Sequence, residues 1–317
     1  MLSGELHPLF DPVFLESVVE ITPWWIALIL VFLTHLGSVF IVVPATVLAY
    51  LRYPERAGTW LGSLFCYFGL MTSIKSLNSA SRPSVDPSVG PEHVPEVLSF
   101  WYSHGAEIST TSFPSGNVML PTILMALLVR DLRVSTFRRR AIAGASVVAL
   151  IAYSRMALGV HYPVDVIGGV VFGLGLVAVV VGLRHRFEDE LTAVFTLAIG
   201  ICLFSVWVRN GVWAVPTVAS LESSNRPLAL GGALGGLVAW QLVNRYRLHG
   251  GTYSLDNALG AIGVVGGFGG MYAVHSIVSH PLVSALWATV IFGVVIATPW
   301  LFPNRITVFE STRAPAK

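Results

Sequence analysis

Long apolar runs separated by short polar segments follow one another along most of the chain. A helix needs about 20 apolar residues to cross the hydrocarbon core of a membrane. Pro44 predicts a kink in the first run, and Pro114, Pro163 and Pro281 stand where helices would begin. The pattern predicts an all-α bundle of about nine membrane-spanning helices, some of them marginal in length: 23–51, 58–76, 115–130, 139–155, 163–184, 191–208, 227–243, 256–278 and 281–303.

The composition supports a polytopic membrane protein. Hydrophobic residues make up 54% of the 317 positions and charged residues only 11%, with a mean hydropathy of +0.73. A soluble domain has about 25% charged residues, so a soluble, disordered or nucleic-acid-binding protein is excluded. The two cysteines, Cys66 and Cys202, fall inside apolar runs and are expected to be buried thiols rather than a disulfide.

Lys and Arg residues gather on one side of the membrane when the connecting segments are assigned to alternate sides. That side receives 14 of the 19 cations, an excess typical of cytoplasmic segments. We therefore expect the N-terminus outside and the C-terminus inside. The inner cations are Arg52, Arg56, Arg130, Arg133, Arg138, Arg139, Arg140, Arg184, Arg186, Arg245, Arg247, Arg305, Arg313 and Lys317, and the outer ones are Lys75, Arg82, Arg155, Arg209 and Arg226.

A polar segment that closes the second span contains Lys75 and Arg82, followed by Pro83. The two cations are seven residues apart, which is two turns of helix, so they would share a face and could bind one anion. Long cationic side chains at a membrane boundary also extend toward water without any ligand. This segment alone leaves both interpretations open.

The start of the third span, residues 109–117, includes Ser115 and Gly116 after Pro114. The unpaired backbone N–H groups and the positive end of the dipole at a helix N-terminus bind phosphate readily. An ordinary N-cap would use the same residues.

The connection between the fourth and fifth spans contains Ser154, Arg155, His161 and Asp165. If the fifth helix begins near Pro163, Asp165 lies in its first turn, within reach of His161. A carboxylate that accepts one imidazole N–H fixes the tautomer and leaves the other nitrogen free as a nucleophile or base. A lone histidine here would be structural, but a His–Asp pair beside an arginine near a membrane boundary indicates a functional site.

All three polar segments fall on the expected extracytoplasmic side. Their order and spacing resemble the three-part signature of the type-2 phosphatidic acid phosphatase superfamily, which includes lipid phosphate phosphatases and polyprenyl diphosphate phosphatases. The resemblance covers about residues 58–184. The residues that carry it are Lys75, Arg82, Pro83, Pro114, Ser115, Gly116, Ser154, Arg155, His161 and Asp165.

The resemblance implies a role for each matching residue. His161 would attack phosphorus and form a phosphohistidine, with Asp165 orienting the imidazole. The phosphoryl oxygens would be bound by Lys75, Arg82, Arg155, Ser115 and the backbone N–H of Gly116. No metal or other cofactor is implied, because the cations would stabilise the charge of the transition state.

The chain departs from the family pattern at one position. Asn117 stands where the second motif of the family has a histidine, which acts there as the general acid for the leaving oxygen. An amide can donate a hydrogen bond but cannot deliver a proton. This departure puts the catalytic competence of the site in question, so Asn117 is included among the candidate catalytic residues.

The resemblance divides the chain into three regions: an N-terminal segment with the first span (1–57), the phosphatase-like core (58–184) and an additional region of four spans (185–317). The longest outer connection carries aromatic residues between positions 94 and 108, together with His104, so it could be a lid for a lipid or an ordinary interfacial anchor. Glycines four residues apart in the later spans favour close helix packing. These pairs are Gly231 and Gly235, Gly232 and Gly236, and Gly266 and Gly270.

The leading hypothesis is an integral membrane phosphatase, in the plasma membrane, that hydrolyses prenyl-type diphosphates or phosphates at the outer face. A lipid phosphotransferase is the alternative within enzymes, and a non-catalytic binder of lipid phosphates is the alternative that Asn117 raises. A transporter is disfavoured because the last four spans carry few polar residues. The expected partner is a membrane lipid phosphate or diphosphate and no nucleic acid; the oligomeric state is left open.

Overall fold

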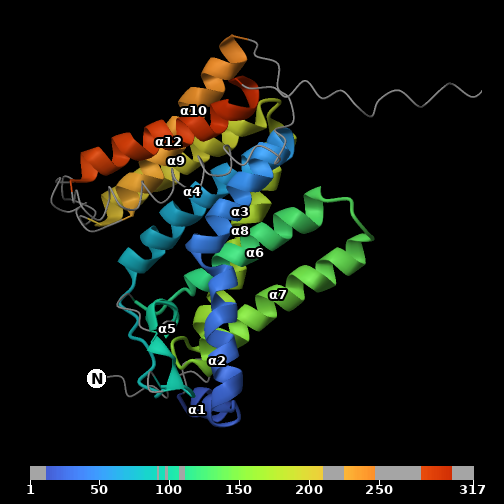
Figure 1. Cartoon of the computed structure of the whole chain (residues 1–317). Coiled ribbons are helices and arrows are strands. Elements are labelled where there is room, and N and C mark those ends of the chain that lie inside the picture. Colours follow the sequence, from blue (N-terminus) through green and yellow to red (C-terminus); the bar gives the residue numbers. More distant parts are fainter. Residues whose placement is uncertain are drawn as a thin grey trace, which may run out of the picture.

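The computed structural model describes residues 12–90, 93–96, 99–106, 111–209, 225–246 and 280–301, and the regular elements in these ranges are all helical (Figure 1). The all-α prediction is confirmed for this part of the chain. The elements are α1 (Pro12–Glu20), α2 (Trp24–Leu33), the 3-10 helix η2 (Thr34–Gly37), α3 (Val39–Arg52), α4 (Pro54–Leu77), α5 (Ser99–Ala106), α6 (Gly116–Asp131), α7 (Phe137–Ala157), α8 (Pro163–Arg186), α9 (Glu190–Arg209), α10 (Arg226–Arg245) and α12 (Pro281–Leu301).

Within the described ranges, α7, α8, α9, α10 and α12 are long and apolar enough to cross a membrane. A sixth span is possible if α1 and the stretch from Trp24 to Gly37, which meet at an angle of 108°, are counted as one broken span. These helices indicate a membrane protein. The number is lower than the nine predicted, because α6 has only 16 residues and α3 only 14, and because α4 carries polar residues such as Lys75. The predicted span 256–278 lies outside the described residues.

The first predicted span differs most from the expectation. Residues 23–51 form two helices, α2 and α3, with η2 between them, rather than one helix kinked at Pro44. The chain leaves the helical path at Ser38, whose extended backbone makes it the N-cap of α3, while Pro44 lies inside α3. The break therefore precedes the proline that was expected to cause a kink. Two other prolines lie as predicted, since α8 begins at Pro163 and α12 at Pro281.

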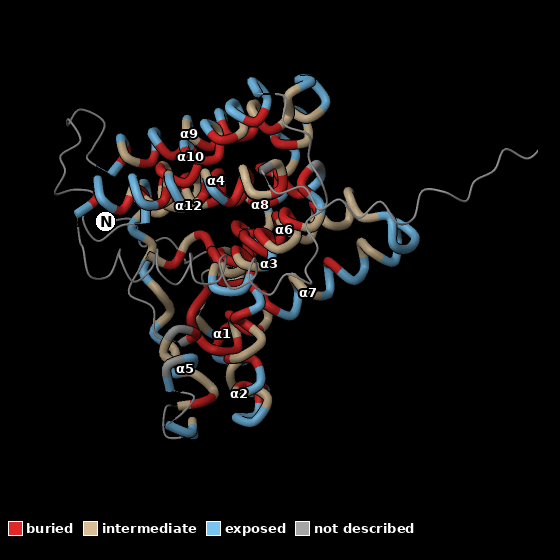
Figure 2. The backbone as a smooth tube through the Cα atoms, turned by 45° about the horizontal axis from the view of Figure 1, so that its top comes forward, coloured by how far each residue is buried: buried red, intermediate tan, exposed pale blue. Residues whose placement is uncertain are grey.

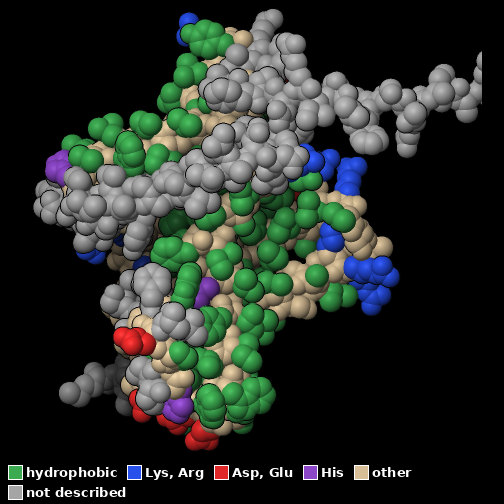
Figure 3. Space-filling model, in the orientation of Figure 1, with side chains coloured by type: hydrophobic (Ala, Val, Ile, Leu, Met, Phe, Trp, Pro, Cys, Tyr) green, Lys and Arg blue, Asp and Glu red, His purple; other side chains and the backbone are tan. Residues whose placement is uncertain are grey.

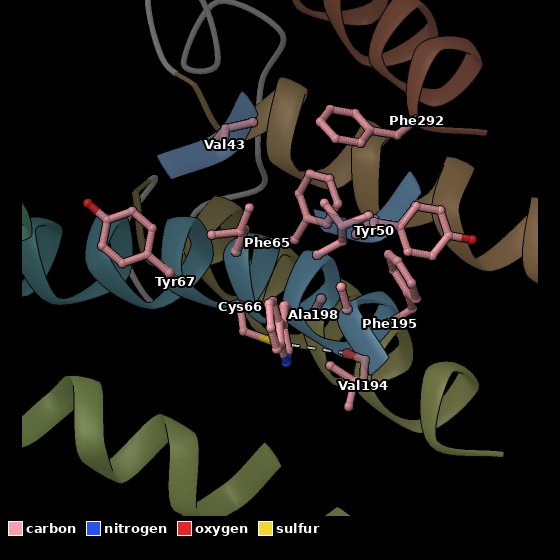
Figure 4. Packing of buried hydrophobic residues seen from close by; sticks show 14 of the residues in the cluster. Val43, Tyr50, Phe65, Cys66, Tyr67, Val194, Phe195, Ala198 and Phe292 are labelled. Atoms are coloured by element: carbon pink, nitrogen blue, oxygen red, sulfur yellow. Dashed lines mark hydrogen bonds between the residues drawn. The ribbon is translucent and has the colours of Figure 1, made fainter. Parts of the chain in front are cut away.

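Helix α4 lies at the centre of the bundle and packs against α3, α6, α8, α9 and α10. Its buried residues, which include Phe65 and Cys66, belong to one continuous apolar core shared with the later helices (Figures 2 and 4). Phe292 of α12 packs edge-on against Phe65, with ring centroids 4.7 Å apart. The two cysteines are free and buried, as the sequence predicts.

Helices α10 and α12 are in close backbone contact, which the glycine spacing predicts. A β-carbon on Gly231 or Gly235 would lie 2.1 Å from the carbonyl oxygens of Ala285 and Thr289, respectively. Gly232 and Gly236 leave room for phenylalanine rings of neighbouring helices. The glycines thus provide packing within the chain. Gly266 and Gly270 lie outside the described residues.

The helices bring the three polar segments to one end of the bundle. The backbone N–H of Ser115, just before α6, donates to the carbonyl oxygen of Asp165 in the first turn of α8 (2.9 Å). The guanidinium of Arg82, in the segment that follows α4, donates to the carbonyl oxygen of Val160, just after α7 (2.7 Å). On the face shown in Figure 3, Lys and Arg side chains gather at the opposite end, where α6 leads into α7, and acidic side chains gather near α1 and α5.

The glycine contacts between α10 and α12 give a test of the fold. We expect Gly235→Val to lower the apparent melting temperature by about 5 °C, because the side chain would meet the backbone of α12 and force the helices apart. The measurement is thermal unfolding of the purified protein in detergent. The matched control is Gly200→Val on α9, where a β-carbon would meet no atom of the described chain within 4 Å. Equal melting temperatures for the two variants would contradict the packing.

Candidate functional site

The candidate residues occupy the ends of four helices and the connections beside them. Lys75 lies in the last turn of α4, and Arg155 in the last turn of α7. Ser115 is the N-cap of α6, Gly116 and Asn117 begin that helix, and Asp165 lies in the first turn of α8. Arg82 and His161 lie in the segments that follow α4 and α7.

His161 and Asp165 form a buried pair. The Nδ1 atom of His161 is 3.3 Å from Oδ2 of Asp165, and the two residues are 2% and 0% exposed. Because an ionised carboxylate only accepts hydrogen bonds, Nδ1 carries the proton of the neutral ring and Nε2 has the free electron pair. Oδ2 also accepts the backbone N–H of Tyr162 (2.8 Å) and the hydroxyl of Ser112, which hold the carboxylate in place.

The Nε2 atom of His161, which carries no proton, accepts a hydrogen bond from a cation. Nε2 is 3.4 Å from a guanidinium nitrogen of Arg82. Arg82 also donates to the carbonyl oxygen of Thr111 (3.4 Å), and the ammonium of Lys75 donates to the same oxygen. The two cations of the first polar segment therefore converge on one point beside the imidazole. A neutral nitrogen base next to two positive charges is an arrangement that can act on an anionic substrate.

Burial keeps the His161 imidazole neutral. Desolvation is the largest cause that lowers its pKa from the ordinary 6.5 to about 3, and the hydrogen bond with Asp165 opposes that shift. The nearby guanidinium groups of Arg155 and Arg82 lower the pKa further. The ring is therefore neutral at neutral pH, and its unprotonated Nε2 can act as a nucleophile or base.

Arg155 is fully buried and only partly hydrogen-bonded within the described chain. One terminal nitrogen of its guanidinium donates to the hydroxyl oxygen of Thr34 (3.2 Å) and to the carbonyl oxygen of Gly105 (2.6 Å). Nε and the second terminal nitrogen have no partner there, and neither does the buried hydroxyl of Ser115. Buried donors of this kind are normally satisfied, so they are available to an anion.

The N-terminus of α6 is held against α8 and α4 by glycines. A β-carbon on Gly169 of α8 would lie 2.7 Å from the carbonyl oxygen of Ser115, and one on Gly116 would lie 2.3 Å from the side chain of Met71. Asn117 is half-buried in the first turn of α6. Gly37 of η2 packs against the backbone carbonyl of Asn117, where a β-carbon would lie only 2.2 Å away.

The connection that carries His161 depends on a glycine conformation. Gly159 has φ = +66°, a left-handed conformation that other residues rarely adopt. It directs the chain out of α7 so that His161 lies over the start of α8. A β-carbon at Gly159 would also lie 2.7 Å from the carbonyl oxygen of Val85. This position therefore accepts no larger residue without a shift of the connection.

Two hydroxyl residues beside the site were not singled out from the sequence. Ser112 lies in the second polar segment, but nothing in the pattern distinguishes it from its serine and threonine neighbours. Thr34 lies in an apolar run about 120 residues before Arg155, and no local signal marks it. Both are recognisable only from the three-dimensional contacts.

The aromatic segment expected near residues 94–108 contains helix α5 and packs beside the site. Tyr102 is buried and donates its hydroxyl to the carbonyl oxygen of Val89 (2.9 Å). The imidazole Nε2 of His35 is 2.8 Å from the carbonyl oxygen of Trp101. The side chain of His104 lies outside what the structure describes. Among the described residues there is no group of three or more His, Cys, Asp or Glu side chains that could hold a metal ion.

Comparison with known proteins matches one region of the chain to a protein family. A family model described as PAP2 superfamily matches residues 57–189, the range that contains all of the candidate residues. This match confirms the family resemblance seen in the sequence. Comparisons with curated proteins and with solved structures gave no match.

The buried imidazole gives a test of the site in the absence of substrate. We expect His161 to stay neutral, with the proton on Nδ1, from pH 8 down to about pH 4, because its pKa lies near 3. Nitrogen NMR of histidine-labelled protein measures this, with His161→Ala to assign the signal. Since the unfolded chain binds the proton at the ordinary pKa, the folded state loses stability as the pH falls from about 6.5 toward 3. A titration midpoint near 6.5 would contradict the buried geometry.

Proposed function

We propose that this chain, whose residues 57–189 belong to the PAP2 superfamily, is a membrane phosphatase that hydrolyses prenyl-type lipid diphosphates or phosphates. The observation that carries the proposal is the environment of His161. Its imidazole lies between a carboxylate at Nδ1 and a guanidinium at Nε2, and the ring is neutral. A phosphoryl group bound by the guanidinium would lie beside Nε2, where it would take the place of the Arg82 N–H at the nitrogen's electron pair.

The reaction would proceed in two displacements. In the first, Nε2 of His161 attacks phosphorus, an N–P bond forms and the bond from phosphorus to the leaving oxygen breaks. The Nδ1 proton stays on the ring, where Asp165 stabilises the positive charge that develops on the imidazole. In the second, water attacks the phosphohistidine, the N–P bond breaks and inorganic phosphate leaves.

The cations and the helix terminus would stabilise the transition state. Arg82 and Lys75 lie on the Nε2 side of the imidazole, and Arg155 has two donor groups without a partner in the described chain. The hydroxyl of Ser115 has no partner among the described residues, and the backbone N–H of Gly116 belongs to the first turn of α6. Donors fixed before the reaction stabilise developing charge at little reorganisation cost.

Asn117 would favour substrates with a good leaving group. Loss of a general acid costs about 10²- to 10⁴-fold in rate, which is severe for a lipid alkoxide, a strongly basic leaving group. A phosphate monoester is a stable anion near neutral pH, with a second pKa of about 6, so it can leave without a proton. The amide of Asn117 could donate a hydrogen bond to that oxygen, and we therefore infer that diphosphates are the better substrates.

We propose that the membrane is the plasma membrane, and the charge distribution supports a site on its extracytoplasmic face. Arg133, Arg138 and Arg139 are exposed where α6 leads into α7, and Glu16 and Glu20 are exposed in α1. Figure 3 shows Lys and Arg side chains gathered at the first place and acidic side chains near α1 and α5. An excess of Lys and Arg is typical of cytoplasmic segments. On this basis the site opens to the outer face.

A non-catalytic lipid-phosphate-binding protein is the second candidate, and the observation that favours it is Asn117 itself. Such a protein would use the same cations to bind the anion but would release no phosphate. A phosphatase and a binding protein differ in whether they release phosphate from the lipid, which the next two experiments measure.

Substitution of His161 tests the nucleophile. We expect His161→Ala to abolish phosphate release from a prenyl diphosphate, and Asp165→Asn to lower it by up to about 10⁴-fold while leaving some activity, because Asp165 orients the ring rather than reacting. Radiolabel from substrate should be trapped on wild-type protein and not on His161→Ala. The matched control is His185→Ala at the far end of α8, which should keep full activity. Wild-type turnover in His161→Ala would end the phosphohistidine mechanism.

Substitution of Asn117 tests the leaving-group argument. Wild-type protein should cleave a prenyl diphosphate far faster than the matching monophosphate, and Asn117→His should raise the monophosphate rate by about 10²-fold or more with little change for the diphosphate. The measurement is initial rates of phosphate release from the paired lipids. Equal acceleration of both substrates, or no preference in the wild type, would contradict the argument. No release from any lipid by wild type would favour the binding protein.

A further inference from the structure

The break in the first span places η2 beside the anion-binding residues. This element precedes the region that the family model matches, residues 57–189. Thr34 contacts Arg155, and Gly37 packs against the backbone of Asn117. The second polar segment, through Asn117, and the third, through Arg155, are therefore both in contact with η2.

The hydroxyl of Thr34 bonds differently from those of threonines in unbroken helices. Thr46 of α3 and Thr122 of α6 donate their hydroxyls to carbonyl oxygens four residues earlier in the same helix (2.7 Å each). The hydroxyl oxygen of Thr34 instead accepts an N–H of Arg155, 121 residues away in the sequence (3.2 Å). Thr34 and Arg155 are both 0% exposed, so neither side chain has an alternative partner in solvent.

The contact with Thr34 fixes one side of the Arg155 guanidinium. Thr34 and the carbonyl oxygen of Gly105 bind a single terminal nitrogen, while Nε and the other terminal nitrogen have no partner in the described chain. Because the guanidinium is planar, anchoring one nitrogen at two points sets the direction of the remaining donors. Those remaining donors are the ones available for an anion.

We propose that Thr34 is a positioning residue for Arg155, so that η2, outside the family-matched region, completes the phosphoryl-binding site. The inference rests on the proposed function, since it assigns to Arg155 the binding of a phosphoryl group. Thr34 itself does not touch the phosphoryl group. It acts by holding Arg155 in the orientation in which Nε and the free terminal nitrogen bind two phosphoryl oxygens.

The test compares variants that remove or keep the hydroxyl. Thr34→Val keeps the shape and removes the acceptor, and Thr34→Ser keeps the acceptor. The control is Thr46→Val, another buried threonine, whose hydroxyl bonds within its own helix. Each protein is purified in detergent, and kcat and KM are measured on a prenyl diphosphate. The inhibition constant of orthovanadate, which forms a five-coordinate mimic of the phosphoryl transition state, is measured alongside.

A lost hydrogen bond to a charged group predicts the size of the effect. Thr34→Val should lower kcat/KM by about 10- to 100-fold and raise the vanadate inhibition constant by a similar factor. Thr34→Ser should stay within about threefold of wild type, and Thr46→Val should not differ from it. The retained contact of Arg155 with Gly105 explains why the loss is partial. Unchanged kcat/KM and vanadate inhibition in Thr34→Val, or an equal loss in Thr34→Ser, would overturn the proposal.

Two further measurements distinguish a positioning role of Thr34 from misfolding of the variant and from failure of the proposed phosphatase function. In an Arg155→Lys background, Thr34→Val should have little further effect on vanadate inhibition, and an undiminished effect would overturn the proposal. Stabilisation by vanadate in thermal unfolding needs no turnover. It should be weaker in Thr34→Val than in Thr34→Ser even if no lipid is hydrolysed, and equal stabilisation would overturn the positioning role. If Thr34→Val does not fold, Thr34→Ala takes its place in every comparison.

Discussion

The burial of positive charge around one carboxylate is the constraint on which the site depends. Arg82 and Arg155 act on His161, and Lys75 interacts with Arg82 and with Asp165, whose carboxylate contacts the imidazole. Buried charges are costly unless they are paired. Among the described residues, three cations against one carboxylate leave a surplus of two positive charges, which a phosphoryl dianion would match. Donors of Arg155 and Ser115 likewise have no hydrogen-bond partner in the described part of the chain. The charge and the hydrogen-bonding geometry therefore both favour an anion at this point.

Most of the candidate site was predictable from the sequence because its residues lie in short segments at helix ends. The spacing of His161 and Asp165 around Pro163 predicts a contact in the first turn of a helix, and the two side chains are 3.3 Å apart. Arg82 could be grouped with them only through its motif, since 79 residues separate it from His161. Thr34 was not predictable. Its role depends on a long-range contact in an apolar run, where a threonine ordinarily bonds to its own helix.

Helix positions were predictable where prolines, glycines and apolar runs determine them. They were not predictable where the backbone conformation of a few residues breaks an apolar run. The starts of α8 and α12 follow from Pro163 and Pro281. Gly231 and Gly235 predicted a close helix contact, although not that α12 would be the partner. Hydropathy joined residues 23–51 because α2 and α3 are strongly apolar and the less apolar stretch between them, η2 and Ser38, is short. The break needs Ser38 in an extended conformation and Gly37 against α6, and hydropathy predicts neither requirement.

The site lies between a rigid helical frame and a set of short elements. On the frame side, the backbones of α6 and α8 meet at Gly169 and Ser115, which leaves no room for a lipid chain between them. On the other side are η2, α5 and the segment containing Arg82, which bury fewer apolar residues than the core around α4. Thr34 of η2 and Gly105 of α5 nevertheless anchor Arg155. The short elements therefore orient the donors for the anion, while the frame keeps the imidazole and its carboxylate fixed.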